Sequence, residues 1–244
     1  MMATPDPDRL GGWHWVNRTK GRLRRGEQVR LSGHVALGQL QRALALVRRP
    51  AGADVDIATP EQPDSALASR AHEALMDVSP AIVGHSIRTW LYGSALAALD
   101  RCQADPELLY VASLLHDVGL MRAVTGEDFT IRSGRAALAC GTPEGEDARL
   151  EEIADAIAIH AQPGITVEAD GATGFYVQAG ALLDLVGLRA RELPRSFRDS
   201  VLAQHDRSGL KQDIVPRIRS EARAVPHGRF ALLRRWGFTQ AITS

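Results

Sequence analysis

Apolar residues recur at helical spacing along the central part of the chain. From Pro106 onward they follow an i, i+3, i+4, i+7 pattern, which places them on one face of a helix, and Gly119 is the expected glycine at its C-terminal end. Residues 147–161 repeat the pattern, with Ile157 and His160 on one stripe. Both segments are therefore predicted to be amphipathic helices.

The other apolar segments also favour helices over strands, because the strict alternation typical of a half-buried strand is nearly absent. Further helices are expected at residues 66–79, 81–101, 175–188, 215–224 and 230–236. We therefore predict an all-α fold, a bundle of about eight to ten helices.

The first 55 residues have a different character. An amphipathic helix is expected between Leu31 and Val47, and a segment with three prolines at residues 50–64 is typical of a linker. We divide the chain into a basic N-terminal arm with its linker, residues 1–55, and a helical domain with C-terminal helices, residues 56–244. The arm helix has an apolar face to cover, so either it folds back on the domain or it joins two copies in a homo-oligomer.

Composition narrows the class of protein. Of the 244 residues, 45% are hydrophobic and 24% are charged, which excludes a disordered, collagen-like or coiled-coil chain. Apolar stretches are far shorter than the ~20 residues that span a bilayer, and no signal peptide is evident, so we expect a cytoplasmic protein. Cys102 and Cys140 are too few for a disulfide framework and do not form a C-x-x-C motif, so we expect both to be small core residues.

Charge is unevenly distributed along the chain. Residues 1–50 carry a net charge of +7, residues 51–184 carry −14, and residues 185–244 carry +7. The basic ends suit either nucleic acid or the acidic centre of the same molecule or of a second subunit. We favour the second interpretation and expect no nucleic-acid partner, because no exposed aromatic residues are interleaved with the basic ones.

Candidate chemistry comes from polar residues that interrupt segments where the pattern predicts a core. They are His85, His116, Asp117, His160 and Asp184. Asp184 has apolar neighbours and no Arg or Lys three or four residues away, and an ionised carboxylate buried alone is costly, so a bound cation is its expected partner. Imidazole and carboxylate ligands together suit zinc, manganese, iron or nickel, and do not suit a calcium cage.

The order of these residues resembles that of a known family. His85, then His116 with Asp117, then Asp184, all in helical contexts, is similar to the HD-domain superfamily of metal-dependent phosphohydrolases. The closer resemblance is to its cyanamide hydratase-like branch. It rests on five ordered segments within roughly residues 60–220, which begin His-Ser-Ile-Arg-Thr-Trp, Leu-Leu-His-Asp-Val-Gly, Asp-Phe-Thr-Ile-Arg-Ser, Ala-Ile-Ala-Ile-His and Leu-Leu-Asp-Leu-Val-Gly.

This resemblance implies a site with defined roles. His85, His116, Asp117 and Asp184 would hold one divalent metal ion, with zinc expected and manganese, iron or nickel as alternatives. His160, Asp117 and Arg88 would carry the catalytic roles, with His160 facing the open coordination position. Two departures are Leu120, where relatives that act on cyanamide usually have a polar residue, and Leu185, where many members have an asparagine.

The implied reaction uses a metal-bound hydroxide on a small molecule. On a nitrile such as cyanamide, hydroxide would attack the carbon while His160 donates a proton to the nitrogen. The main alternative is hydrolysis of a nucleotide or small phosphomonoester, in which Arg88 could hold a phosphate oxygen, although an ion pair with an acidic neighbour is an equal interpretation of Arg88.

Two further alternatives remain open. A diiron oxygenase would need more ligands, and His160 is the only histidine between Asp117 and Asp184. In a non-catalytic binding module, Trp13 and Trp15 would dock a partner, whereas in an enzyme we expect them to pack against the domain or a second subunit. The remaining histidines have no comparable context and are interpreted as structural: His14, His34, His72, His205 and His227.

Overall fold

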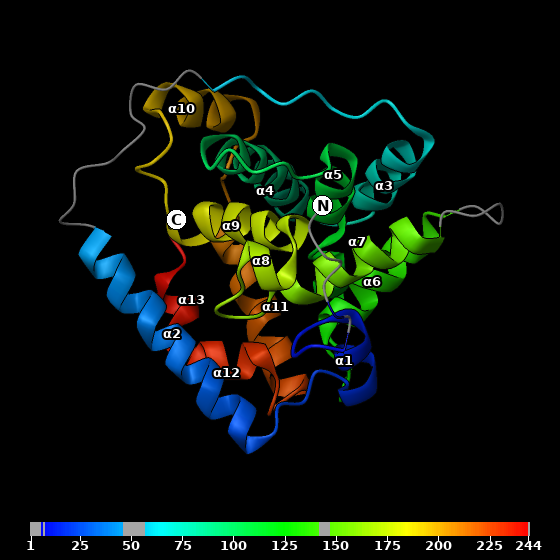
Figure 1. Ribbon diagram of the computed structural model, residues 1–244, viewed down its shortest axis with the longest axis vertical. Coiled ribbons are helices and arrows are strands. Elements are labelled where there is room, and N and C mark those ends of the chain that lie inside the picture. The colour runs from blue at the N-terminus through cyan, green and yellow to red at the C-terminus, as the bar shows by residue number, and fades with distance from the viewer. Residues whose placement is uncertain (1–5, 7, 46–56, 142–146, 244) are drawn as a thin grey trace.

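The computed structural model describes residue 6 and residues 8–45, 57–141 and 147–243, and it is built from helices (Figure 1). Within these residues the only strand-like pairing is an isolated bridge between Val124 and Glu127. The predicted all-α fold is thus confirmed. None of the described helices is long and apolar enough to cross a membrane.

The helices follow one another in this order: α1 Trp13–Thr19, α2 Arg25–Ala45, α3 Ala66–Met76, α4 Pro80–Leu99, α5 Pro106–Leu115, the 3-10 helix η1 Val118–Met121, α6 Phe129–Ala139, α7 Asp147–His160, α8 Val167–Asp170, α9 Ala172–Val186, α10 Arg195–Gln204, α11 Leu210–Ala224, α12 Arg229–Arg235 and α13 Phe238–Ala241.

The structure corrects the helix that was predicted to end at Gly119. α5 ends at Leu115, and Gly119 lies inside η1. Gly119 does not cap α5 but lets η1 pack closely against the start of α6, because a Cβ on Gly119 would lie 2.2 Å from the carbonyl oxygen of Phe129. The break after α5 turns His116 and Asp117 away from the helix and toward the interior.

Two central helices, α4 and α9, pack along each other through glycines (Figure 1). A Cβ on Gly180 would lie 2.1 Å from the carbonyl oxygen of Thr89, and a Cβ on Gly93 would lie 2.6 Å from that of Tyr176. Ordinary side chains at these positions would force the helices apart. The contact matters for the site, because α4 carries His85 and α9 carries Asp184.

We expect Gly180→Ala to destabilise the protein by about 1–3 kcal/mol, because the added methyl group overpacks this contact. Gly33→Ala on α2 is the matched control, since nothing lies within 4 Å of its Cβ position and alanine in a helix is favoured over glycine by roughly 0.5–1 kcal/mol. Thermal unfolding followed by circular dichroism measures both. Equal melting temperatures for the two variants would contradict the close contact between α4 and α9.

The first half of the predicted arm packs into the bundle. α1 lies against α6 and α7, where Trp15 is 4% exposed and the ring of Trp13 occupies the space left by Gly134. Arg9 forms ion pairs with Asp155 at 2.7 Å and Asp170 at 3.0 Å. The tryptophans thus pack against the domain, and the division of the chain at residue 55 stays a prediction.

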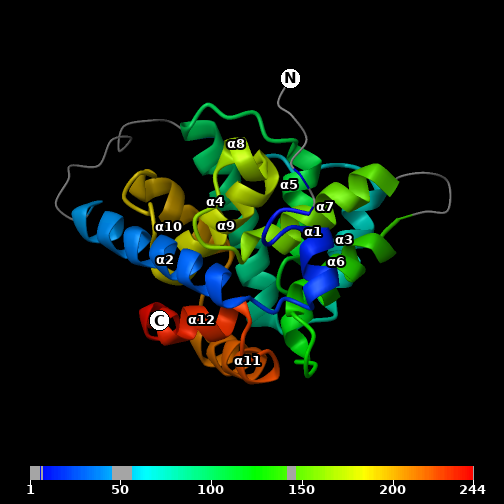
Figure 2. The same ribbon diagram turned by 60° about the horizontal axis from the view of Figure 1, so that its bottom comes forward.

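The second half of the arm, α2, is only partly covered. It runs beside α12 (Figure 2), and the indole nitrogen of Trp236 donates a hydrogen bond to Ser32. Leu31 is buried, but Val29, Leu37 and Leu40 are 74%, 53% and 56% exposed. The predicted helix end at Val47 lies outside the described residues. Homo-oligomer formation through this helix stays a prediction.

Candidate metal centre

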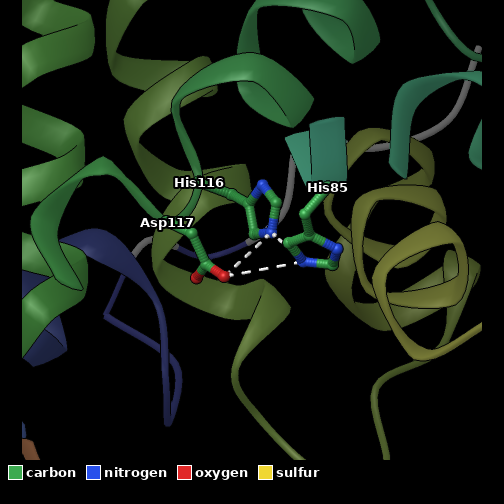
Figure 3. Close-up of side chains that lie close together, drawn as sticks. All are labelled: His85, His116 and Asp117. Carbon is green, nitrogen blue, oxygen red and sulfur yellow. Dashed lines mark hydrogen bonds and ion pairs between the residues drawn. The ribbon is translucent and has the colours of Figure 1, made fainter. Parts of the chain in front are cut away.

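Three side chains from two segments meet in the interior of the bundle (Figure 3). His85 comes from the middle of α4, and His116 and Asp117 follow the last residue of α5. The two histidine Nε2 atoms are 3.3 Å apart, and Asp117 Oδ2 lies 3.6 Å from His85 Nε2 and 3.4 Å from His116 Nε2. All three residues are buried, so their lone pairs face one another rather than water.

Hydrogen bonds on the far side of each ring set the direction of these lone pairs. His116 Nδ1 lies 2.7 Å from the carbonyl oxygen of Ser113, and His85 Nδ1 lies 2.7 Å from Asp184 Oδ2. Because both partners are acceptors, we assign the proton to Nδ1 in each ring, which leaves Nε2 with a free lone pair. An outer acceptor that fixes the tautomer in this way is typical of metal-ligating histidines.

The spacing of the three donor atoms fits a tetrahedral metal ion. Zinc binds histidine nitrogen at about 2.0–2.1 Å, so two nitrogens on one tetrahedral zinc lie about 3.3 Å apart. The separation between the histidine nitrogens is 3.3 Å, and the carboxylate oxygen lies at a similar distance from both. Two uncharged nitrogens with facing lone pairs repel each other unless a cation lies between them. The residues therefore fit a divalent metal ion, as predicted, with His85, His116 and Asp117 as ligands.

His160, at the end of α7, lies beside this group of three. Its Nε2 is 3.8 Å from Asp117 Oδ1, and its ring packs edge to face on that of His116. Its Nδ1 donates to the carbonyl oxygen of Ile157 at 2.6 Å. Burial is the main cause that lowers the pKa of His160 to about 3, with a further contribution from His116. The ring is therefore neutral, with an Nε2 lone pair that can accept a proton, and its role as a proton donor stays a prediction.

Asp184 lies behind His85 and outside the group of three. Its carboxylate accepts from Arg88 Nε at 2.8 Å and from Arg88 Nη2 at 2.9 Å, as well as from His85. A second arginine, Arg207, donates from Nε to Asp184 Oδ1 at 3.3 Å. Burial raises the pKa of Asp184, but the hydrogen bonds from His85 and Arg88 outweigh it and lower the pKa to about 2. The structure thus shows Asp184 as an outer partner that orients His85, and its direct ligand role stays a prediction.

The guanidinium of Arg88 has hydrogen-bond partners at all three of its nitrogens. It is fully buried, and its remaining nitrogen Nη1 donates to the carbonyl oxygens of His205 and Asp206 at 3.2 and 2.7 Å. Asp184 therefore has a cationic partner without a metal ion. This ion pair agrees with the structural interpretation of Arg88, and its catalytic role stays a prediction.

The wall beside His160 contains residues that sequence reasoning missed. Phe129 packs edge to face on His160 and stacks on Phe230, and the backbone N–H of Phe129 donates to Glu221 at 2.7 Å. Burial raises the pKa of Glu221 to about 7. Arg229 is paired with Asp128 at 3.0 Å. Asp128 also caps the start of α6 by accepting a hydrogen bond from the backbone N–H of Thr130, and this Asp-x-Thr pattern is the signal by which the sequence marks the position.

Comparison with known proteins identifies the family. The HD domain model matches residues 82–203, which contain all five predicted metal-centre residues. No curated protein matches the chain. HD domains are generally metal-dependent hydrolases, and the buried His-His-Asp group found here fits that chemistry. Because the match spans half of its length, this chain belongs to the HD domain family.

Proposed function

We propose that this protein adds water to a small uncharged molecule of the nitrile class, such as cyanamide. The observation that carries the proposal is that the groups beside His85, His116 and Asp117 offer no free positive charge to a substrate. His160 is uncharged, and Arg88, the cation expected to hold a phosphate, is bound to Asp184 instead. An uncharged, compact substrate suits such a buried site better than a phosphate ester does, because a phosphate ester needs positive groups that converge on it.

The residues have separate tasks in this reaction. A divalent ion at His85, His116 and Asp117 would supply Lewis acidity and a coordinated water whose pKa is lowered to about 7. His160 Nε2, with its free lone pair, accepts the proton of the attacking water and passes it to the nitrile nitrogen. The new C–O bond forms as one C–N π bond breaks, which converts cyanamide to isourea. Transfer of the remaining O–H proton to the same nitrogen, as the C=O double bond forms and the C=N double bond becomes single, gives urea.

The runner-up activity, phosphomonoester hydrolysis, needs positive groups that converge on the substrate. Arg229 and Arg132, which reach the wall around His160 and Phe129, are each paired with a carboxylate, at 3.0 Å to Asp128 and 2.7 Å to Glu221. They support the wall rather than present free charge. Phosphate-ester hydrolysis is therefore the second candidate activity, and the assay described next measures it alongside nitrile hydration.

The test is a substrate panel on protein loaded in turn with zinc, manganese, nickel and iron. We expect urea to be formed from cyanamide and expect phosphate release from nucleotides and phosphomonoesters to stay at background. His160→Gln should keep the bound metal but lower kcat by about 10²–10⁴, because the proton acceptor is lost. His227→Gln, at an exposed position, is the control and should leave kcat unchanged.

Phosphate release that exceeds urea formation in kcat/KM, and that depends on His160, would replace the nitrile proposal with the phosphohydrolase. An unchanged kcat in His160→Gln would remove that histidine from the mechanism.

A further inference from the structure

Three arginine side chains from two helices line one cavity at the C-terminal end of the chain. Arg219 comes from α11, and Arg234 and Arg235 come from the last turn of α12. Thr239 and Gln240 of α13 complete the lining of a cavity of about 340 Å³. None of these residues belongs to the metal centre or to the wall beside His160.

Within the part of the chain that the structure describes, no carboxylate neutralises the positive charge in this cavity. Residues 210–244 contain only two acidic side chains, Asp213 and Glu221, and both are engaged elsewhere: Asp213 pairs with Arg217 at 2.9 Å, and Glu221 pairs with Arg132 at 2.7 Å. Among the described residues, no carboxylate lies within ion-pair distance of the three arginines of the cavity. Three like charges held close together without an acid repel one another unless an anion joins them.

Helix electrostatics explain only part of this arrangement. Cations are favoured at the C-terminal end of a helix, which accounts for Arg234 and Arg235 at the end of α12. Arg219 lies in the interior of α11, so its convergence on the same cavity has no such cause. The chain also places Thr239 and Gln240 there. The Thr239 hydroxyl donates to Gln240 Oε1 at 3.0 Å, and the side-chain NH2 of Gln240 is a donor that can bind an oxyanion.

We propose that this cavity binds a small molecule that carries two or more linked phosphate groups. Guanidinium groups match phosphate oxygens two at a time, and three of them balance the charge of a di- or triphosphate rather than that of a single carboxylate. The cavity volume of about 340 Å³ falls within the range of small-molecule sites. This site is separate from the metal centre and does not depend on the substrate proposed for it.

The test is isothermal titration calorimetry of the full chain with inorganic triphosphate. We expect one equivalent to bind, and expect Arg219→Gln and Arg234→Gln each to weaken binding about tenfold, because each removes charge-assisted hydrogen bonds. Arg223→Gln is the matched control: it removes the same charge from an exposed position one turn further along α11, outside the cavity, and should change the affinity less than twofold. All these arginines are exposed, and unchanged melting temperatures would verify folding.

Two further titrations separate this cavity from other sources of binding. Inorganic phosphate and sulfate at the same ionic strength should bind at least tenfold more weakly than triphosphate, and equal affinities would overturn the linked-phosphate ligand. His116→Ala, checked for folding by circular dichroism, should bind triphosphate as wild type does, and lost binding would assign the anion to the metal centre. Absence of saturable binding, or an equal loss in Arg223→Gln, would overturn the proposal.

Discussion

The His116→Ala variant is expected to lose its bound metal ion and its catalytic activity together. Elemental analysis of the wild-type protein should find about one equivalent of zinc, manganese, nickel or iron. His116 supplies one of three donor atoms at tetrahedral spacing, and its Nε2 is 3.3 Å from that of His85. Two remaining ligands cannot hold the ion, so metal content should fall below a tenth of an equivalent and turnover should fall to background.

The same measurement on Asp184→Asn separates a ligand from an outer partner. If Asp184 is an outer partner that orients His85, its replacement should lower the affinity for metal by about 10–100-fold. The variant should then bind the ion again at high metal concentration. His227→Ala, at an exposed position, is the control and should keep its metal. Complete metal loss in Asp184→Asn at saturating metal would make Asp184 a direct ligand.

Two other results would redirect the interpretation. Two equivalents of iron in the wild type would favour the oxygenase alternative over hydration. No metal in the wild type, even after supplementation, would contradict the interpretation of the donor spacing as a metal site.

The local sequence indicated His85, His116 and Asp117 because each is a polar residue in an apolar segment, and it grouped Asp184 with them as a ligand. It did not predict that α5 ends at Leu115, directly before His116 and Asp117, because the apolar pattern continues toward Gly119. The same reasoning predicted the α4 and α9 helices that carry His85 and Asp184. Whether a single segment forms a helix can thus be predicted from the spacing of its own apolar residues.

Contacts between distant segments could not be predicted in this way. Asp184 has no basic neighbour along its helix, yet Arg88, 96 positions earlier, binds it with two hydrogen bonds. Arg229 reaches Asp128 across a similar separation, and Trp15 is buried by α7. Pairing of this kind depends on how the helices cross, which the periodicity of each helix does not determine.

Arg88→Gln should be the most destabilising single change in the site. Arg88 and Asp184 are both buried, and the variant removes the cation that gives this carboxylate two hydrogen bonds. Arg207 Nε, 3.3 Å from Asp184 Oδ1, is then its remaining cationic partner. Breaking such a pair costs about 3–5 kcal/mol, which for a chain of this size lowers Tm by roughly 6–20 °C. Arg195→Gln is the matched control, since it breaks an exposed pair with Asp199 and should change stability by less than about 0.5 kcal/mol.

Unfolding measured at acid pH tests whether the charge of Asp184 causes the loss of stability in Arg88→Gln. The pKa of Asp184 is lowered from 3.8 to about 2 in the folded protein, so its contribution to stability is complete above about pH 4 and disappears as the pH falls through about 2. Without the two hydrogen bonds from Arg88, the effect of burial on that pKa is less opposed and the pKa rises, so protonation of Asp184 relieves part of the cost of the buried charge. The free-energy gap between wild type and Arg88→Gln, measured by urea unfolding, should therefore shrink from pH 7 to pH 3. A gap that stays constant with pH would show that Arg88 stabilises the fold through its contacts with the backbone at residues 205 and 206, and not through the charge of Asp184.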